Sequence, residues 1–175
     1  MSKQPQLIMH WKKSAEDFTA NIPSDVKVET FAQRENALDE WLDLVQYGLT
    51  GTKQGPACYK SLMSDKEWYS EDNCFFLVID GRAAATITVI CNKDKKQGYI
   101  HMVACHPDFR GRGLGNVLNE VAVSALYKEG METAYLTTDD FRIPAIKTYL
   151  RYGFTPDVST PDFKERWDNV LKEIK

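Results

Sequence analysis

Three glycines within five residues, at positions 111, 113 and 115, most constrain how this chain can fold. They follow the apolar run Tyr99–Cys105 and lead into Leu114–Lys128, where apolar residues recur at helical spacing. Glycine adopts positive φ without steric cost and lets a ligand approach the backbone closely. The first turn of a helix also presents unpaired N–H groups and the positive end of the helix dipole. The segment therefore predicts a strand, a turn and a helix that together bind an anion.

Neighbouring patterns extend this unit into a sheet. Strand periodicity at 133–138, after the helix, predicts a crossover unit with strands 99–105 and 133–138 as parallel neighbours. Upstream, the runs 74–79 and 83–91 flank Asp80-Gly81, a pair typical of a tight hairpin. We therefore predict an α/β (α+β) fold. Its mixed, mostly antiparallel sheet has one parallel crossover pair and helices on both faces.

Shorter patterns complete the predicted organisation. They indicate further strands at 7–11 and 26–31, and helices at 34–47, 59–63, 143–152 and 163–174. Neither a repeat nor a low-complexity linker divides the sequence, whose length suits one domain. We predict a single domain over residues 1–175, in which residues 1–25 form an N-terminal extension with an extra strand.

Composition excludes several classes of function. The formal net charge of −3 leaves no basic surface, so nucleic acid is not an expected partner, and it slightly favours a cationic substrate. No apolar run approaches the roughly 20 residues of a membrane span, and the N-terminus does not resemble a signal peptide. We therefore expect a cytoplasmic protein without a membrane partner, as a monomer or a homodimer.

The four cysteines predict no metal site. Cys58, Cys74, Cys91 and Cys105 are widely spaced and contain no CxxC pair, which argues against structural zinc. The last three lie in or beside strand-like apolar runs, where we expect buried, reduced thiols.

The glycine-rich segment matches one phosphate-binding pattern and departs from two others. A P-loop needs Gly-Lys-Ser/Thr, whereas Leu-Gly-Asn follows Gly113. A dinucleotide-binding GxGxxG motif that begins at Gly113 needs its third glycine at Leu118. The pattern R-x-x-G-x-G fits Arg110, Gly113 and Gly115. We therefore expect the segment to bind a diphosphate through backbone N–H groups, assisted by two arginines.

Two motifs together resemble a known family. The run V-A-C-H-P-x-x-R-G-x-G-L-G at 103–115 is similar to the signature of the GCN5-related N-acetyltransferases (GNAT), and A-I-x-x-Y-x-x-x-G-F at 145–154 is similar to a second motif of that family. Both occur in the family's order, separated by a helix and a strand. The close resemblance covers 99–156, about a third of the chain, within a predicted cofactor-binding region 98–156. It implies acetyl-CoA as co-substrate, held in a slot where the parallel strands splay at a bulge.

The resemblance also assigns roles to individual positions. It implies that Tyr149 protonates the departing thiolate, a step suited to a phenol because the pKa values of phenol and thiol are close. Arg142 departs from the family pattern, which commonly has asparagine there, and it is a candidate for contact with a phosphate or an acidic substrate. The implied cofactor-binding residues are Val103, Cys105, Arg110, Gly111, Arg112, Gly113, Leu114, Gly115, Asn116, Arg142 and Ala145.

The general base and the acceptor stay open at this point. The candidate bases are Glu71, Asp72, His101 and Asp139, and strand periodicity predicts His101 on the same face as Val103 and Cys105. The main functional hypothesis is direct acetyl transfer from acetyl-CoA to a primary amine of a small molecule or peptide, through a ternary complex. The alternatives are a non-catalytic acyl-CoA-binding sensor or interaction module, and an acyltransferase using a longer acyl donor or a hydroxyl acceptor.

Overall fold

One seven-stranded sheet, in the order β2-β3-β4-β5-β6-β1-β7, organises the chain. The computed structural model describes residues 4–174. The strands are β1 (Leu7–Lys12), β2 (Lys27–Thr30), β3 (Cys74–Ile79), β4 (Arg82–Asn92), β5 (Gln97–Cys105), β6 (Thr133–Thr138) and β7 (Thr155–Pro156). The helices are α1 (Ala37–Val45), α2 (Pro56–Tyr59), α3 (Leu114–Lys128), α4 (Ile143–Arg151) and α5 (Pro161–Ile174).

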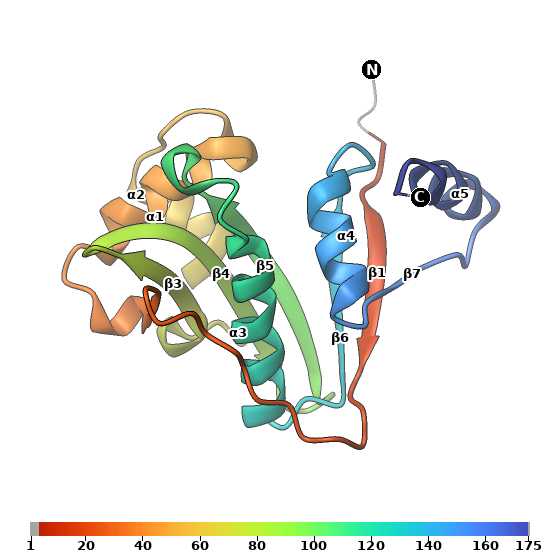
Figure 1. Ribbon diagram of the computed structural model, residues 1–175, viewed down its shortest axis with the longest axis horizontal. Coiled ribbons are helices and arrows are strands. Elements are labelled where there is room, and N and C mark those ends of the chain that lie inside the picture. The colour runs from red at the N-terminus through yellow and green to blue at the C-terminus, as the bar shows by residue number, and fades with distance from the viewer. Residues whose placement is uncertain (1–3, 175) are drawn as a thin grey trace.

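The sheet consists of two groups of strands. The antiparallel strands β2 to β5 form one group, and β6, β1 and β7 form the other. The two groups meet through β5 and β6, which within residues 4–174 are the one parallel pair. Figure 1 shows the groups diverging from one end of the molecule to the other. The predicted mixed, mostly antiparallel sheet with a parallel crossover pair is therefore confirmed.

A bulge in β5 marks the point where the groups diverge. The two parallel strands pair over Gln97–Ile100 and Thr133–Leu136, and the printed register ends there. Just beyond, the pairing of β5 with β4 shifts register, and Met102 has a φ of 51°. An extra residue in one strand bends it and increases its twist. The expected bulge and splay are thus present, at Met102.

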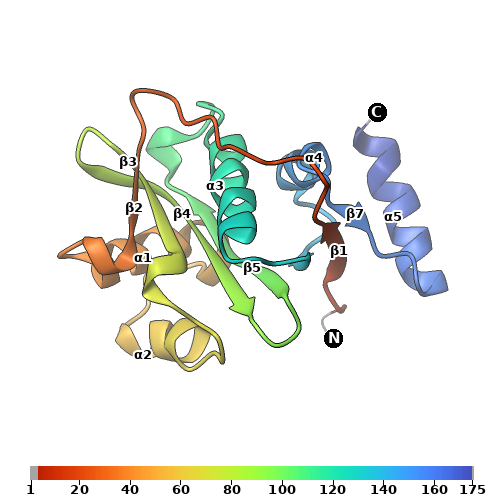
Figure 2. The ribbon, with the colours of Figure 1, turned by 90° about the horizontal axis from the view of Figure 1, so that it is seen from below.

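Two hydrophobic clusters cover opposite faces of the β2–β5 group. One includes the apolar stripe of α3, with Leu118 and Leu126 buried against Ile87 of β4. The other includes Trp41 of α1 and Met63, packed with Phe76 of β3 and other buried residues. Figure 2 shows α3 on one side of these strands and α1 and α2 on the other. Helices on both faces were predicted from the sequence.

One detail differs from the expected elements. The helix predicted to reach Tyr47 ends at Val45, because Tyr47 and Gly48 have non-helical backbone angles within the following turn, Gln46–Thr50. The extra N-terminal strand is present, and it lies between β6 and the short β7. No helix in the described part of the chain is long and apolar enough to cross a membrane.

Candidate functional site

The glycine-rich turn has the backbone conformation that its sequence predicts. Gly111 and Gly113 have φ values of 77° and 75°, in the left-handed region that favours glycine. Gly113 is the N-cap of α3, so the first amides of the helix open at this turn. A Cβ at either position would meet no atom within 4 Å. Glycine is therefore required here for its conformation, and the space above the turn is open.

A cavity of about 580 Å³ lies over this turn, and we call it the outer cavity. Its walls come from the end of β5, the glycine-rich turn and the start of α3, the start of α4, and the turn after α1. Ten of the predicted cofactor-binding residues line it: Val103, Cys105, Arg110, Gly111, Gly113, Leu114, Gly115, Asn116, Arg142 and Ala145. The fold therefore brings together residues that the sequence separates by more than 30 positions.

The side chains of two predicted residues have other partners. Arg112 does not line the outer cavity, and its guanidinium donates to the carboxylate of Asp25 over 2.8 Å. Asn116 lines the cavity, while its side-chain oxygen accepts a hydrogen bond from Arg151 over 2.7 Å. Of the two arginines expected to add charge, Arg110 alone lines the outer cavity.

A second, smaller cavity lies deeper between the diverging strands. This inner cavity has a volume of about 170 Å³ and shares Val103, Arg142 and Ala145 with the outer cavity. It lies where β5 and β6 lose their pairing, so backbone groups of β5 border it without a partner from β6. The other lining residues are Gln6, Leu49, Tyr99, Ile100, His101, Met102, Leu136, Thr137, Thr138 and Tyr149.

Tyr149 reaches the inner cavity from α4. The residue is 6% exposed, and burial raises the pKa of Tyr149 to about 12, with the positive charge of Arg142 acting in the opposite direction. A phenol in this state keeps its proton at neutral pH and can donate it. Thr138 of β6 also lines this cavity, and its hydroxyl is buried without a hydrogen-bond partner among the described residues.

Arg142 joins two walls of the slot that the outer and inner cavities form together. Its Nε donates to the carboxylate of Asp139 over 2.9 Å, and its Nη2 donates to the backbone carbonyl of Gly48 over 2.7 Å. These bonds tie the start of α4 to the turn after α1. Asp139 also accepts a hydrogen bond from Gln6 over 3.2 Å. The carboxylate therefore already has two partners, which disfavours Asp139 as a general base.

The predicted face of His101 is wrong. Its Nε2 lies 2.9 Å from the carbonyl oxygen of Leu62, on the side of the sheet covered by α1 and α2. Val103 and Cys105 pack against the opposite cluster, with α3. The bulge at Met102 inserts one residue into the strand and so shifts its alternation. Strand periodicity could not reveal this shift.

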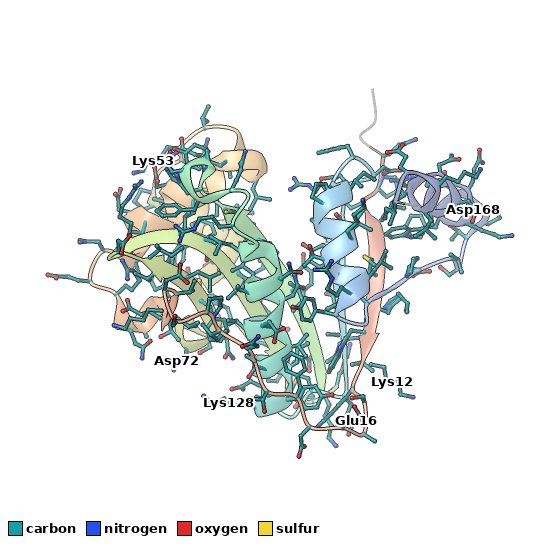
Figure 3. The ribbon with its side chains drawn as sticks, viewed as in Figure 1. Lys12, Glu16, Lys53, Asp72, Lys128 and Asp168 are labelled. Carbon is teal, nitrogen blue, oxygen red and sulfur yellow. The ribbon has the colours of Figure 1, made fainter. Side chains whose placement is uncertain are left out.

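The other candidate bases lie away from the cavities. Glu71 and Asp72 are exposed in a short 3-10 turn before β3 and line neither cavity. Figure 3 shows Asp72 on the outer side of the β2–β5 group, away from α4. Of the four candidates, His101 alone lines a cavity and has no carboxylate partner in the described part of the chain.

Sequence reasoning was incomplete for the cysteines and aromatic residues. All four thiols are free, and Cys74 and Cys91 are buried as expected. Cys105 is only half-buried and lines the outer cavity, because its face of β5 is the one left open by the splay. Tyr99 was not identified as a site residue from the sequence, although a residue two positions before His101 is expected on the same face of the strand. In residues 4–174 no three His, Cys, Asp or Glu side chains gather as a metal site would require.

Comparisons with known proteins agree with this geometry. The model of the acetyltransferase (GNAT) family matches residues 36–154, more than half of the chain. The chain therefore belongs to the GNAT family of acetyltransferases. Among solved structures, a GCN5-related N-acetyltransferase from Sphaerobacter thermophilus superposes with a TM-score of 0.71 at 17% identity, covering 88% of this chain and 50% of that one. The fold is thus that of the acyl-CoA N-acyltransferases.

Curated relatives have acetyltransferase names. A mycothiol acetyltransferase from Streptomyces griseus is 25% identical over 138 residues, which are 77% of this chain and 44% of that protein. An uncharacterized N-acetyltransferase from Methanocaldococcus jannaschii is 24% identical over 159 residues, 84% of this chain and 69% of that protein. The chain thus spans less than half of the length of the first relative.

The residues present fit acetyl-CoA, the co-substrate of this family. An open turn with two left-handed glycines, the N-terminus of a 15-residue helix and the cation of Arg110 suit a diphosphate. The unpaired edge of β5 suits an extended amide-bearing arm, which can bind to a strand edge through main-chain hydrogen bonds. A thioester at the end of that arm would then lie toward the inner cavity.

Proposed function

We propose that this protein transfers the acetyl group of acetyl-CoA directly to a primary amine of a small molecule or peptide, through a ternary complex. The observation that carries the proposal is the junction of the two cavities in the gap between β5 and β6, with Tyr149 on the inner wall. One cavity is large enough for a cofactor arm, and the other leaves room for an acceptor beside the same opening.

The residues of the two cavities have separate roles in this reaction. Amides at the start of α3 and Arg110 hold the diphosphate, and the backbone of Val103 and Cys105 binds the arm and polarises the acetyl carbonyl. The acceptor nitrogen bonds to the carbonyl carbon, the carbon–sulfur bond breaks, and the sulfur receives the proton of the Tyr149 hydroxyl. Because both substrates occupy the slot together, no covalent enzyme intermediate is needed.

The inner cavity also bears on the acceptor. Arg142 is the one Lys, Arg, Asp or Glu among its lining residues, and its charge is balanced by Asp139. A polycationic amine would meet no net negative charge in this cavity. The slight preference for a cationic substrate expected from the net charge therefore has no counterpart there, and we favour acceptors with a single amine.

Replacement of the proposed acid tests the function. We expect Tyr149→Phe to lower kcat for amine acetylation by about 10²-fold or more, because the thiolate would depart without a proton donor. CoA binding, measured by calorimetry, should change little. Tyr152→Phe is a matched control, since that hydroxyl lies on the same segment and bonds Glu120 instead of facing the cavity.

The pH dependence provides a second measurement. An acid must be protonated to act, so activity should be lost as pH rises through the pKa of Tyr149. Because burial raises that pKa to about 12, we expect no alkaline limb from this group below roughly pH 10. Tight CoA binding without turnover on any amine would support the alternative, an acyl-CoA-binding sensor.

A further inference from the structure

Two side chains of β5 that project toward α1 and α2 form a hydrogen-bonded pair at the inner cavity. The Tyr99 hydroxyl lies 3.1 Å from His101 Nδ1, and both residues line the cavity. The Tyr99 ring is stacked on Tyr135 of β6, with ring centroids 4.7 Å apart and planes 15° apart. The pair is therefore held in the cavity wall by packing as well as by hydrogen bonds.

The partners of His101 determine its tautomer. The Leu62 carbonyl, 2.9 Å from Nε2, can only accept a hydrogen bond, so Nε2 carries the imidazole proton. In the neutral ring Nδ1 then has no proton and accepts from the Tyr99 hydroxyl. The imidazolium would keep both contacts, with Nδ1–H donating to the Tyr99 oxygen. Both protonation states are thus hydrogen-bonded, and only the Tyr99 hydroxyl proton changes direction.

The geometry points to Tyr99 and His101 as a proton relay that serves as the general base for the acceptor amine. This inference rests on the proposed acetyl transfer. Tyr99 contacts the acceptor nitrogen, and His101 stores the proton through Tyr99. Tyr149, which comes from α4, and the relay, which comes from β5, thus line one cavity, as an acid and a base for the two ends of one transfer require.

The proton balance closes over one turnover. The nitrogen of the neutral amine forms its bond to the thioester carbonyl carbon and gives one proton to the Tyr99 oxygen, while the Tyr99 hydroxyl proton passes to His101 Nδ1. The carbon–sulfur bond breaks, and the sulfur takes the Tyr149 proton. Water then returns a proton from His101 to Tyr149. The amide and the CoA thiol leave, and both residues regain their initial states.

The surroundings keep His101 neutral before reaction. Burial lowers the pKa of His101, the bond to the Leu62 carbonyl partly offsets this, and the charge of Lys66 lowers it again. Among the described residues, the other titratable or charged side chains that line the cavity or stack on the pair are Tyr99, Tyr135, Tyr149 and Arg142. The carboxylate of Asp139 bonds the lining residues Arg142 and Gln6 but does not itself line the cavity. Once the acceptor nitrogen has bonded to the carbonyl carbon, it is positively charged and far more acidic than a free ammonium. A weak base is therefore sufficient to remove its proton.

The experiment compares the pH dependence of kcat for His101→Gln, Tyr99→Phe and the wild type, with a monoamine acceptor. A base acts when unprotonated, so wild-type kcat should be present above the pKa of His101 and fall as pH decreases through it, below about pH 6.5. Gln can still donate to Leu62 but binds no proton. We expect each variant to lose about 10²-fold in kcat together with this acidic limb.

Double substitution and a control separate a relay from packing. Residues that act as a unit are non-additive, so the double variant should be within about threefold of either single variant. Tyr135→Phe keeps the stack and leaves the relay intact, so its kcat should stay within about threefold of wild type. Unchanged CoA affinity in calorimetry would show that all four variants retain the fold around the outer cavity.

Three results would overturn the relay, in distinguishable ways. Wild-type activity retained by His101→Gln, with the acidic limb in place, removes the relay and leaves acetyl transfer standing. If the wild type acetylates no amine, the proposed function fails and the relay fails with it. Nitrogen NMR of the wild type should show the proton on Nε2 of His101, and a proton on Nδ1 at neutral pH would also contradict the proposal.

Discussion

The outer and inner cavities of the slot are built in different ways. The outer cavity comes mainly from two continuous stretches, 103–118 and 142–148, joined by two residues of the turn after α1. It offers backbone amides, glycines and the arginines Arg110 and Arg142. The inner cavity takes side chains from β5, β6 and α4, and from Gln6 and Leu49, which lie far away in the sequence. The outer cavity is thus characterised by its backbone groups, and the inner cavity by the identity of its side chains.

This contrast explains why the two ends differ in how readily they are recognised. A helix N-terminus and left-handed glycines bind a diphosphate whatever the neighbouring side chains are. An acceptor pocket depends on which side chains meet across the gap, and similar folds can therefore serve different acceptors. The following substitutions test whether the two ends are energetically separate.

The largest effect on ligand binding is expected at the glycine-rich turn. Gly113→Val places a β-branched residue at a φ of 75°, which costs about 1–3 kcal/mol, and it distorts the first amides of α3. We expect the Kd for CoA, measured by calorimetry, to rise by about 10- to 100-fold.

A matched control separates strain from binding at this turn. Gly130→Val introduces the same strain at a φ of 73°, at the other end of α3, with equally open surroundings. Its Kd for CoA should match that of the wild type. Equal losses of affinity in both variants would mean that the turn acts only through stability.

A smaller effect on substrate binding, shared by the outer and inner cavities, is expected for substitution of Arg142. Arg142→Ala removes the bonds to Asp139 and to the Gly48 carbonyl, and this side chain lines both cavities. Because charged hydrogen bonds contribute about 1.5–3 kcal/mol, we expect KM to rise about tenfold for both acetyl-CoA and the amine. Steady-state kinetics with each substrate varied in turn provide the measurement.

A conservative variant separates the contribution of the Arg142 charge from that of its hydrogen bonds. Arg142→Lys keeps the charge but lacks the fork that reaches Asp139 and Gly48 together, so it should rescue only part of the loss. A change confined to one substrate would contradict the role of Arg142 as a joint wall of the two cavities.

The smallest effect on binding is expected at Gly98, where β5 is still paired with β6. A Cβ at this position would lie 2.2 Å from Leu126 Cδ2 of α3. Gly98→Ala should therefore destabilise the fold by about 1–3 kcal/mol, as overpacking does. Thermal unfolding gives the stability, and the Kd for CoA of the folded protein should stay the same.

A double substitution tests the cause of that instability. In a Leu126→Ala background the new methyl group would occupy the vacated space, so Gly98→Ala should then cost much less. An equal cost in both backgrounds would show that the clash with Leu126 is not the reason. A large loss of CoA affinity would instead couple the paired end of β5 to the open end.

Local sequence features predicted most elements and the outer cavity. The hairpin at Asp80-Gly81, the crossover from β5 through α3 to β6, and the left-handed glycines all follow from residues that are neighbours in the chain. Turns, helix starts and strand alternation depend on such neighbours, and the resemblance of two motifs to a known family implied the cofactor-binding positions, ten of which line the outer cavity.

The face of His101 and the make-up of the inner cavity were decided by the tertiary structure alone. The bulge at Met102 reverses the face of His101, and its place depends on how β5 fits against β4 and β6, which no residue pattern records. The contacts of Leu62 with His101 and of Gly48 with Arg142 join residues 39 and 94 positions apart. Contacts of this kind arise from the packing of whole elements, so the acceptor end of the slot emerged only once the chain was folded.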